Sequence, residues 1–173
     1  MARIIYKKGL EGQNRLECIE GIEIELLNGQ NAVVYPKYSE EVMLEEEEVQ
    51  YYDEEYITEI AALKETESHR VTGKLFGCGS PAAKYVAQFH SDKYGIFALP
   101  TLLAAMEIQY QKSDIDELAE IIEGADLLRD FTSKVWSCSR YGENRGWVAY
   151  GKYGFAGNGN LCYSNLVVPV ILY

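Results

Sequence analysis

The sequence predicts an α+β fold, and three observations support that prediction. Near the start, apolar and acidic residues alternate on either side of an Asn-Gly pair, which indicates a β-hairpin. The middle of the chain holds stretches in which apolar residues recur at helical spacing. After Phe131 the helix formers give way to short β-prone pieces separated by Gly- and Asn-rich loops. With 173 residues, 47% of them hydrophobic and 25% charged, the chain has the length and composition of a folded protein.

The hairpin is predicted from two short runs. Ile22–Leu26 alternates apolar and acidic residues, Asn28-Gly29 forms the turn, and Ala32–Tyr35 returns. Pro36 then either ends the second strand or marks it as an edge strand, because proline cannot donate to a sheet.

Capping signals place the helices. A serine followed by proline and a threonine before an apolar run are both typical of helix starts. The predicted helices run from about Asp53, with Asp53 as cap, from Ser80-Pro81 to about Ser91, from Thr101 through Tyr110, and from Ser113 to Gly124, with Asp116 at a capping-box offset. The predicted late strands are Lys134–Ser139, Gly146–Tyr150 and Leu166–Leu172.

Charge divides the chain into two parts. The 16 basic and 27 acidic residues give a net charge of −11, and the acidic excess falls within residues 11–68, which hold seventeen acids and three bases. This balance argues against nucleic acid as a partner, since affinity for phosphates comes largely from Lys and Arg. We therefore predict an acidic N-terminal attachment segment, residues 1–68, containing the hairpin and the first helix. Tyr51, Tyr52, Tyr56, Ile57 and Ile60 give it an apolar face for a homo-oligomer or a docking partner.

Targeting and redox signals are sparse. The first residues contain no apolar run of signal-peptide length, and no eighteen apolar residues occur in a row. We expect synthesis in the cytoplasm without insertion into a membrane. The four cysteines, Cys18, Cys78, Cys138 and Cys162, form no close pair, so we expect them to be reduced.

Residues 69–173 carry an ordered set of landmarks, which are Pro81–Ala87, Phe97–Thr101, Val135–Ser139, Gly146-Trp147 and Val167–Tyr173. This series resembles the bacterial C-type-lectin-like modules of unknown function that share their fold with formylglycine-generating enzymes and with the variable proteins of diversity-generating retroelements. Val168 stands where that family usually has Arg, and Cys138 replaces a Ser. The resemblance implies a C-type-lectin-like module at residues 69–173, preceded by the small α+β segment of residues 1–68.

Catalytic and metal-binding patterns find little support. The two histidines, His69 and His90, precede Cys138 and Cys162 along the chain, and nothing in their flanks indicates a nucleophile with its base. Formylglycine-generating relatives use a copper-binding cysteine pair, which makes Cys138 and Cys162 the enzyme candidates, but the sequence around Cys162 does not match that active site. We predict that both are packed as small apolar groups, with no catalytic residue and no cofactor. Beyond Phe131 a single acid, Glu143, remains, so we predict no metal site.

A binding surface is the function that remains. Residues 140–165 are rich in Tyr, Asn, Gly and Arg, the residue types of adaptable binding loops. In the lectin-like folds that the chain resembles, loops between late strands cluster on one face. The predicted ligand-binding residues are Tyr141, Asn144, Arg145, Tyr153, Asn158, Asn160 and Tyr163.

The expected function is a non-enzymatic binding or structural protein. The resemblance and the missing signal peptide favour a bacteriophage virion component, such as a head or tail fibre or a decoration protein, that binds a host-surface glycan or a partner protein. In that setting residues 1–68 attach the module to a virion partner or to another copy. Two alternatives stay open, a cysteine enzyme of the formylglycine-generating type and a bacterial cytoplasmic protein-interaction module.

Overall fold

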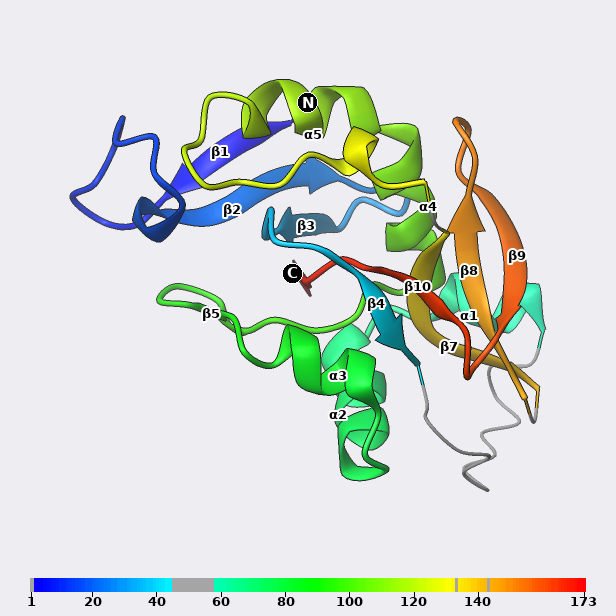
Figure 1. Cartoon of the computed structure of the whole chain (residues 1–173). Helices are drawn as coiled ribbons and strands as arrows, with labels where there is room; N and C mark the ends of the chain where they lie inside the picture. The colour runs from blue at the N-terminus through cyan, green and yellow to red at the C-terminus, as the bar shows by residue number, and fades with distance from the viewer. Residues whose placement is uncertain (1, 45–57, 133, 143) are drawn as a thin grey trace.

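A computed structural model describes residues 2–44, 58–132, 134–142 and 144–173 (Figure 1). The acidic run Glu45–Glu48, the expected cap Asp53, the aromatic residues predicted for assembly (Tyr51, Tyr52 and Tyr56) and Ile57 lie outside the described residues. Helices and strands both contribute to the described part, so the fold is α+β.

The first sheet joins the two ends of the chain. Its order is β1 (Arg3–Tyr6), β2 (Ile19–Glu25), β3 (Asn31–Val34) and β11 (Val170–Leu172), and all its pairs are antiparallel. The predicted hairpin is confirmed as β2–β3, with Gly29 at a positive φ of 85° in its turn. Pro36 follows the end of β3, which is an inner strand flanked by β2 and β11.

The second sheet has the order β4 (Ser39–Met43), β10 (Ser164–Val167), β7 (Val135–Gly142), β8 (Arg145–Tyr150) and β9 (Phe155–Asn160). Strands β10 and β7 are parallel, and the other neighbours are antiparallel. The strand predicted over Leu166–Leu172 is two strands in two sheets. Val168-Pro169 separates them, because Pro169 has no N–H for a ladder and its carbonyl instead accepts the N–H of Tyr35.

The predicted boundary at residue 68 does not coincide with a boundary in the fold. Strand β3, from the acidic segment, pairs with β11, and β4, from the same segment, pairs with β10. Residues on both sides of position 68 therefore build the same two sheets. The charge contrast along the chain therefore reports on surface composition and not on strand pairing.

The described helices are α1 (Glu59–Lys64), α2 (Ser68–Gly77), α3 (Pro81–Val86), α4 (Leu102–Tyr110) and α5 (Lys112–Ala119), with 3₁₀ turns η1 (Leu16–Cys18) and η3 (Leu128–Asp130) and a small hairpin of β5 (His90–Ser91) and β6 (Gly95–Ile96). The predicted caps Ser80 and Thr101 are confirmed, because each side chain accepts a backbone N–H three residues later. Helix α3 ends earlier than predicted because the chain turns into β5. Asp116 does not cap α5, whose N-cap residue is Gln111; its carboxylate accepts the N–H groups of Leu128 and Arg129, at the start of η3.

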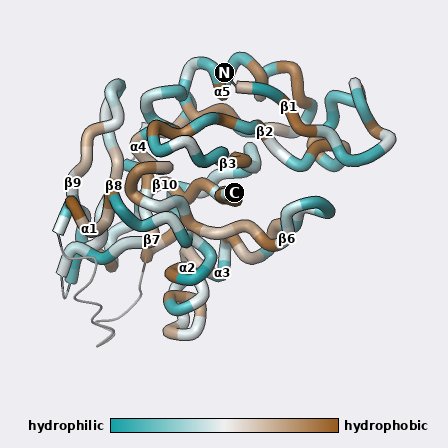
Figure 2. Tube along the Cα trace, turned by 180° about the vertical axis from the view of Figure 1, so that it is seen from behind, coloured by the Kyte–Doolittle hydropathy of each residue, from teal (hydrophilic) through white to brown (hydrophobic). Residues whose placement is uncertain are grey.

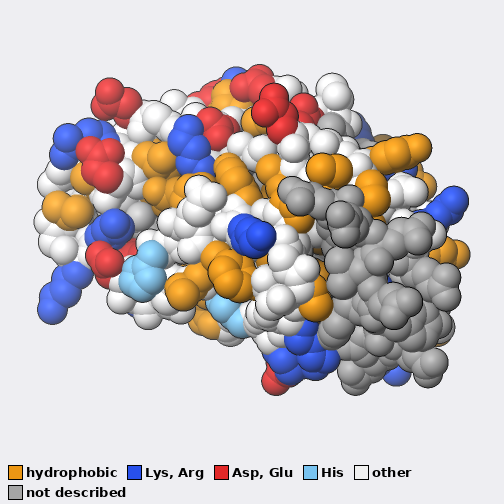
Figure 3. Space-filling view, turned by 60° about the horizontal axis from the view of Figure 1, so that its bottom comes forward, with side chains coloured by type: hydrophobic (Ala, Val, Ile, Leu, Met, Phe, Trp, Pro, Cys, Tyr) orange, Lys and Arg blue, Asp and Glu red, His pale blue; other side chains and the backbone are white. Residues whose placement is uncertain are grey.

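Two main apolar clusters lie between sheets and helices. The first sheet packs against α4 and α5 through Ile22, Ile108 and Ile115, all fully buried. The second cluster contains the fully buried Trp136, together with residues of α2 and α3. Figure 2 shows apolar stretches of chain at α4 and β10, in the middle of the molecule. Figure 3 shows Lys and Arg side chains at several separate places on the face it presents.

A third, smaller cluster anchors the C-terminal strand. Ile171 of β11 is 2% exposed and lies with Val33 and Phe97, with Tyr35 and Phe89 packed around them. On the side away from β3, Val170 exchanges backbone hydrogen bonds of 2.8 and 2.9 Å with Ala98. Strand β11 is thus held from both sides.

Truncating the side chain that anchors β11 should destabilise the protein. Ile171→Ala removes buried methyl groups and leaves a cavity, so we expect a loss of about 2–5 kcal/mol in the free energy of unfolding. The control is Ile96→Ala, since Ile96 is 55% exposed and its truncation should change stability little. Urea denaturation followed by circular dichroism measures both, and equal midpoints for the two variants would contradict this role for β11.

An ion pair and a tyrosine join the first sheet to the C-terminal residue. The Arg3 guanidinium and the Tyr173 hydroxyl both donate hydrogen bonds to the Glu23 carboxylate, and the Tyr94 ring stacks on Tyr173 with centroids 4.7 Å apart. The hydrogen bond from Arg3 lowers the pKa of Glu23, although burial opposes the shift. The ionised carboxylate is therefore the form that the fold stabilises.

The contribution of Glu23 should depend on pH. Because its pKa is lower in the folded state, its stabilisation is present above the ordinary Glu pKa of about 4.3 and is lost as the pH falls through the lowered value. Glu23→Gln should lower the urea midpoint at pH 7, and the gap from the parent chain should close in strong acid. Glu25→Gln, on the exposed end of the same strand, should show no such gap. A gap for Glu23→Gln that persists unchanged at the lowest pH would refute the assignment.

Candidate functional site

The predicted binding residues lie at two opposite ends of the β8–β9 hairpin. The two strands pair without interruption from Arg145 opposite Asn160 to Tyr150 opposite Phe155. Five residue steps separate these ends, which is about 17 Å along a strand. Tyr153, in the turn, is therefore remote from Arg145 and Asn160. The sequence-based expectation of a single clustered face is wrong, because the regular hairpin carries its two ends apart.

At the Arg145 end, several of the predicted residues serve the hairpin itself. Arg145 Nη1 donates to Asn158 Oδ1 at 2.8 Å, and Asn160 Oδ1 accepts the Cys162 N–H at 3.0 Å. The Asn144 carbonyl accepts the Leu161 N–H at 3.1 Å. These contacts fix the connections between strands.

Two tyrosines complete this end of the hairpin. The Tyr141 ring packs edge-on against the buried Trp147 ring, with centroids 4.8 Å apart, so this contact covers part of the Tyr141 ring. Tyr163 is 69% exposed, so most of its ring is available to a ligand.

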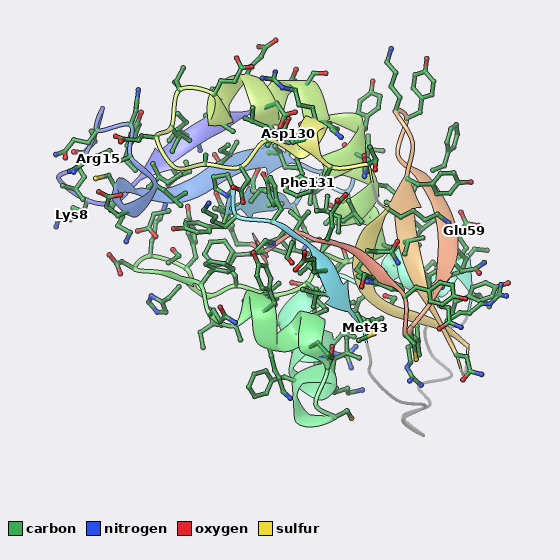
Figure 4. All side chains as sticks on the ribbon, viewed as in Figure 1. Lys8, Arg15, Met43, Glu59, Asp130 and Phe131 are labelled. Atoms are coloured by element: carbon green, nitrogen blue, oxygen red, sulfur yellow. The ribbon has the colours of Figure 1, made fainter. Side chains whose placement is uncertain are left out.

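The other end of the hairpin borders a groove of about 860 Å³. Its walls come from three places, the junction of α4 and α5, the segment after η3, and the β8–β9 turn. Figure 4 shows side chains projecting from the tip of this hairpin, and it labels Asp130 and Phe131 on the neighbouring segment. The groove is lined by Gln109, Tyr110, Gln111, Lys112, Ser113, Asp114, Asp116, Glu117, Arg129, Phe131, Thr132, Tyr150, Gly151, Lys152 and Tyr153.

Three exposed tyrosines give the groove its aromatic surface. Tyr110 and Tyr153 are each 64% exposed and Tyr150 is 41% exposed. Phe155 continues the surface outside the groove, with its ring centroid 6.1 Å from those of both Tyr150 and Tyr153. Sequence reasoning found only Tyr153 here. Tyr110 ends the helix predicted from Thr101, and no local signal in the sequence links it to a turn more than forty residues away.

Glycine fixes the position of the turn. Gly154 has a φ of 65°, and a Cβ at this position would lie 2.2 Å from the Met106 carbonyl oxygen of α4. Gly151, at a φ of 73°, accepts the Gly154 N–H at 3.1 Å. The close approach that glycine permits seats the turn directly on the helix backbone. The tyrosines on each side of the groove are thus carried by elements in contact.

The opposite wall is held by a buried carboxylate. Asp116, 4% exposed, accepts the Leu128 N–H at 2.6 Å and the Arg129 N–H at 2.9 Å, which ties η3 to α5. Lys112 Nζ donates to the Phe131 carbonyl at 3.2 Å. The wall is therefore fixed by polar contacts before any ligand is present.

Cations lie over two of the rings. Lys152 Nζ is 5.8 Å from the Tyr153 centroid, and Lys134 Nζ is 5.5 Å from that of Tyr150. Arg129 pairs with Glu120, and Asp114 and Glu117 add carboxylates to the lining. The groove combines aromatic faces with amides and charges of both signs.

The two cysteines of the enzyme hypothesis differ in environment. Cys138 is buried as predicted, and burial raises the pKa of its thiol to about 12, with the nearby Glu65 carboxylate adding to the shift. Cys162 is exposed, so the prediction that it packs as an apolar group is wrong. It follows the end of β9, in a connection on the surface. The Cys138 thiol is thus protonated at neutral pH and poorly suited to nucleophilic attack.

Within the described part of the chain, no three His, Cys, Asp or Glu side chains are grouped so that they could hold a metal ion. None of the helices described there combines the length and apolar character needed to cross a membrane. His69 Nε2 lies 2.6 Å from the Ile96 carbonyl oxygen.

Comparison with known proteins found no matching family model, no matching curated protein and no matching solved structure.

Cysteine reactivity should follow these environments. Cys162 should be alkylated by iodoacetamide in the folded protein, whereas Cys138 should react only after unfolding because it is buried and its pKa is about 12. Peptide mapping by mass spectrometry distinguishes the two sites, with Cys162→Ser as the control that removes the exposed one. Labelling of Cys138 at the rate of Cys162 under native conditions would contradict the assignment.

Proposed function

We propose that this chain is a non-enzymatic binding protein that holds its ligand in the groove beside the β8–β9 turn. The observation that carries the proposal is the set of three exposed tyrosines, Tyr110, Tyr150 and Tyr153, around one groove with fixed walls. Tyrosine offers a large contact area at a small cost in conformational entropy, so exposed tyrosines at such a place favour binding. Tyr150, Tyr153 and Phe155 also form one contiguous exposed aromatic surface, and such surfaces commonly mark interaction sites.

The chemistry of the lining favours a glycan as the ligand. The apolar C–H face of a sugar ring packs against aromatic rings, and its hydroxyl groups bond to planar amides and carboxylates. The groove supplies both kinds of group, with Gln109, Gln111 and Glu117 beside the tyrosines. A host-surface polysaccharide fits these features.

The resemblance to lectin-like modules supports the same class of function. The Leu99-Pro100-Thr101 landmark leads into α4, and two helices follow it. Trp136 and Trp147 stand on the adjacent strands β7 and β8, and the last landmark enters β11. This order agrees with a lectin-like module to which residues 2–44 add strands. With the resemblance, we extend the proposal to a bacteriophage virion component, a fibre or decoration protein that binds the host surface.

The alternative of a formylglycine-generating type of enzyme has less support. That chemistry needs a cysteine pair available as thiolates, and the Cys138 thiol is buried with its pKa raised to about 12. The tyrosine-lined groove has no comparable role in a thiol reaction. Binding therefore explains more of the described surface.

Truncation of the groove tyrosines should weaken binding without unfolding the protein. Tyr153→Ala and Tyr110→Ala should each reduce affinity more than about tenfold, as expected for central aromatic contacts, and leave the melting temperature nearly unchanged. A glycan array carrying bacterial surface polysaccharides, read beside thermal melts, makes the measurement.

Two matched controls lie at the far end of the hairpin. Tyr163→Ala removes an equally exposed tyrosine, and Arg145→Ala removes the contact to Asn158, so both should retain binding. If these two variants lose binding while Tyr153→Ala keeps it, the site lies at the Arg145 end. If no polysaccharide binds, a glycan is the wrong ligand class.

A further inference from the structure

The outer edge of β9 lacks the features that usually protect an edge strand from pairing with another chain. Within the described residues, β9 pairs only with β8, and no strand lies on its other side. The six residues Phe155–Asn160 include no charge and no proline. An edge strand presents a row of backbone N–H and C=O groups that can pair with another chain, and proteins usually interrupt such rows.

Other edges of the two sheets carry such interruptions. Strand β1 bears Arg3 and has an irregular register between Ile5 and Tyr6. Strand β4 bears Glu40 and Glu41, and its pairing with β10 shifts register as well. At the remaining edge, β11 is bridged by Ala98. Strand β9 keeps six consecutive pairs with β8 and has none of these features.

The register of the hairpin tells which groups of β9 point outward. The Leu161 N–H donates to the Asn144 carbonyl, so this pair is a hydrogen-bonded one. Bonded and non-bonded pairs alternate along an antiparallel ladder. The backbone groups of Gly157 and Gly159 therefore face β8. Those of the alternate residues face away from it, and these residues are Ala156, Asn158 and Asn160.

We propose that β9 is a self-association edge, to which a second copy of this chain adds its own β9 antiparallel about a two-fold axis at Asn158. In that register Asn158 lies opposite Asn158, and Ala156 lies opposite Asn160 of the other copy. The outward N–H and C=O groups of Asn158 and the Ala156 carbonyl then meet partners. The Ala156 N–H shares the Asn160 carbonyl of the other copy, which already accepts the Tyr163 N–H at 3.0 Å. The two five-stranded sheets become continuous.

The side chains permit this register. Gly157 of one copy falls opposite Gly159 of the other in the non-bonded pairs, where strands approach most closely, and neither residue has a side chain to obstruct the approach. The electrostatics also favour this edge. Two copies with a net charge of −11 repel one another, and the six residues of β9 add no carboxylate to that repulsion. The tyrosine groove lies at the hairpin turn, so this inference does not depend on the proposed function.

Charge placed on the two-fold axis tests the proposal. Sedimentation velocity of the full chain over a range of concentrations should show dimers. Asn158→Lys and Asn158→Asp each set like charges opposite one another and should each raise the dimer dissociation constant about tenfold or more. An equimolar mixture of the two variants should restore association, because an ammonium then faces a carboxylate. Asn158→Ala is the matched control, since it also loses the contact to Arg145 but adds no charge, and it should dimerise like the parent.

Each result decides the matter. A parent chain that stays monomeric at every concentration overturns the proposal, and so does a mixture that associates no better than its components. If a charged variant fails to fold, hydrogen exchange of the parent chain replaces it. The amides of residues 156, 158 and 160 should exchange quickly in dilute solution and slowly in concentrated solution, and exchange that is independent of concentration would overturn the proposal equally.

Discussion

The pairing of β11 with β3 is the constraint on which both sheets depend. Val170–Leu172 lies against Ala32–Val34 on one side and is bridged by Ala98 on the other. Immediately before it, Pro169 prevents the strand from continuing backwards in the same sheet, so β10 belongs to the other sheet. The two-residue connection Val168-Pro169 therefore limits how far apart the two sheets can lie, and helices pack between them.

Helix α4 connects the core to the groove. It packs against β7 and β8 from within the core, and its backbone at Met106 is where the β8–β9 turn is seated. The exposed rings at the groove are thus attached to a helix whose residues are mostly buried, through a contact that only glycine allows. Helix α4 and strand β8 pack in the core along their length and line the groove at their ends.

Local signals in the sequence predicted the local parts of the fold. Asn28-Gly29 dictates its turn, and Ser80 and Thr101 cap the helices that follow them, because each effect acts within a few residues. Strand β9 was not predicted, since its glycines and asparagines have low β-propensity and only pairing with β8 makes it a strand. For the same reason, only part of the tyrosine-lined groove could be predicted from the sequence. Tyr153 stands in a visible loop, whereas Tyr110 reaches the groove only through tertiary packing.

The closure of the first sheet also bears on how the protein is made. Val170, the partner of Val34, is synthesised about 140 residues after it. At ordinary rates of translation this delay is on the order of ten seconds, during which the β2–β3 hairpin has an open, apolar edge. The nascent chain then offers a template for mispairing or for a chaperone until β11 emerges. Expression yield should therefore respond to chaperone supply more than the modest size of the folded chain would suggest.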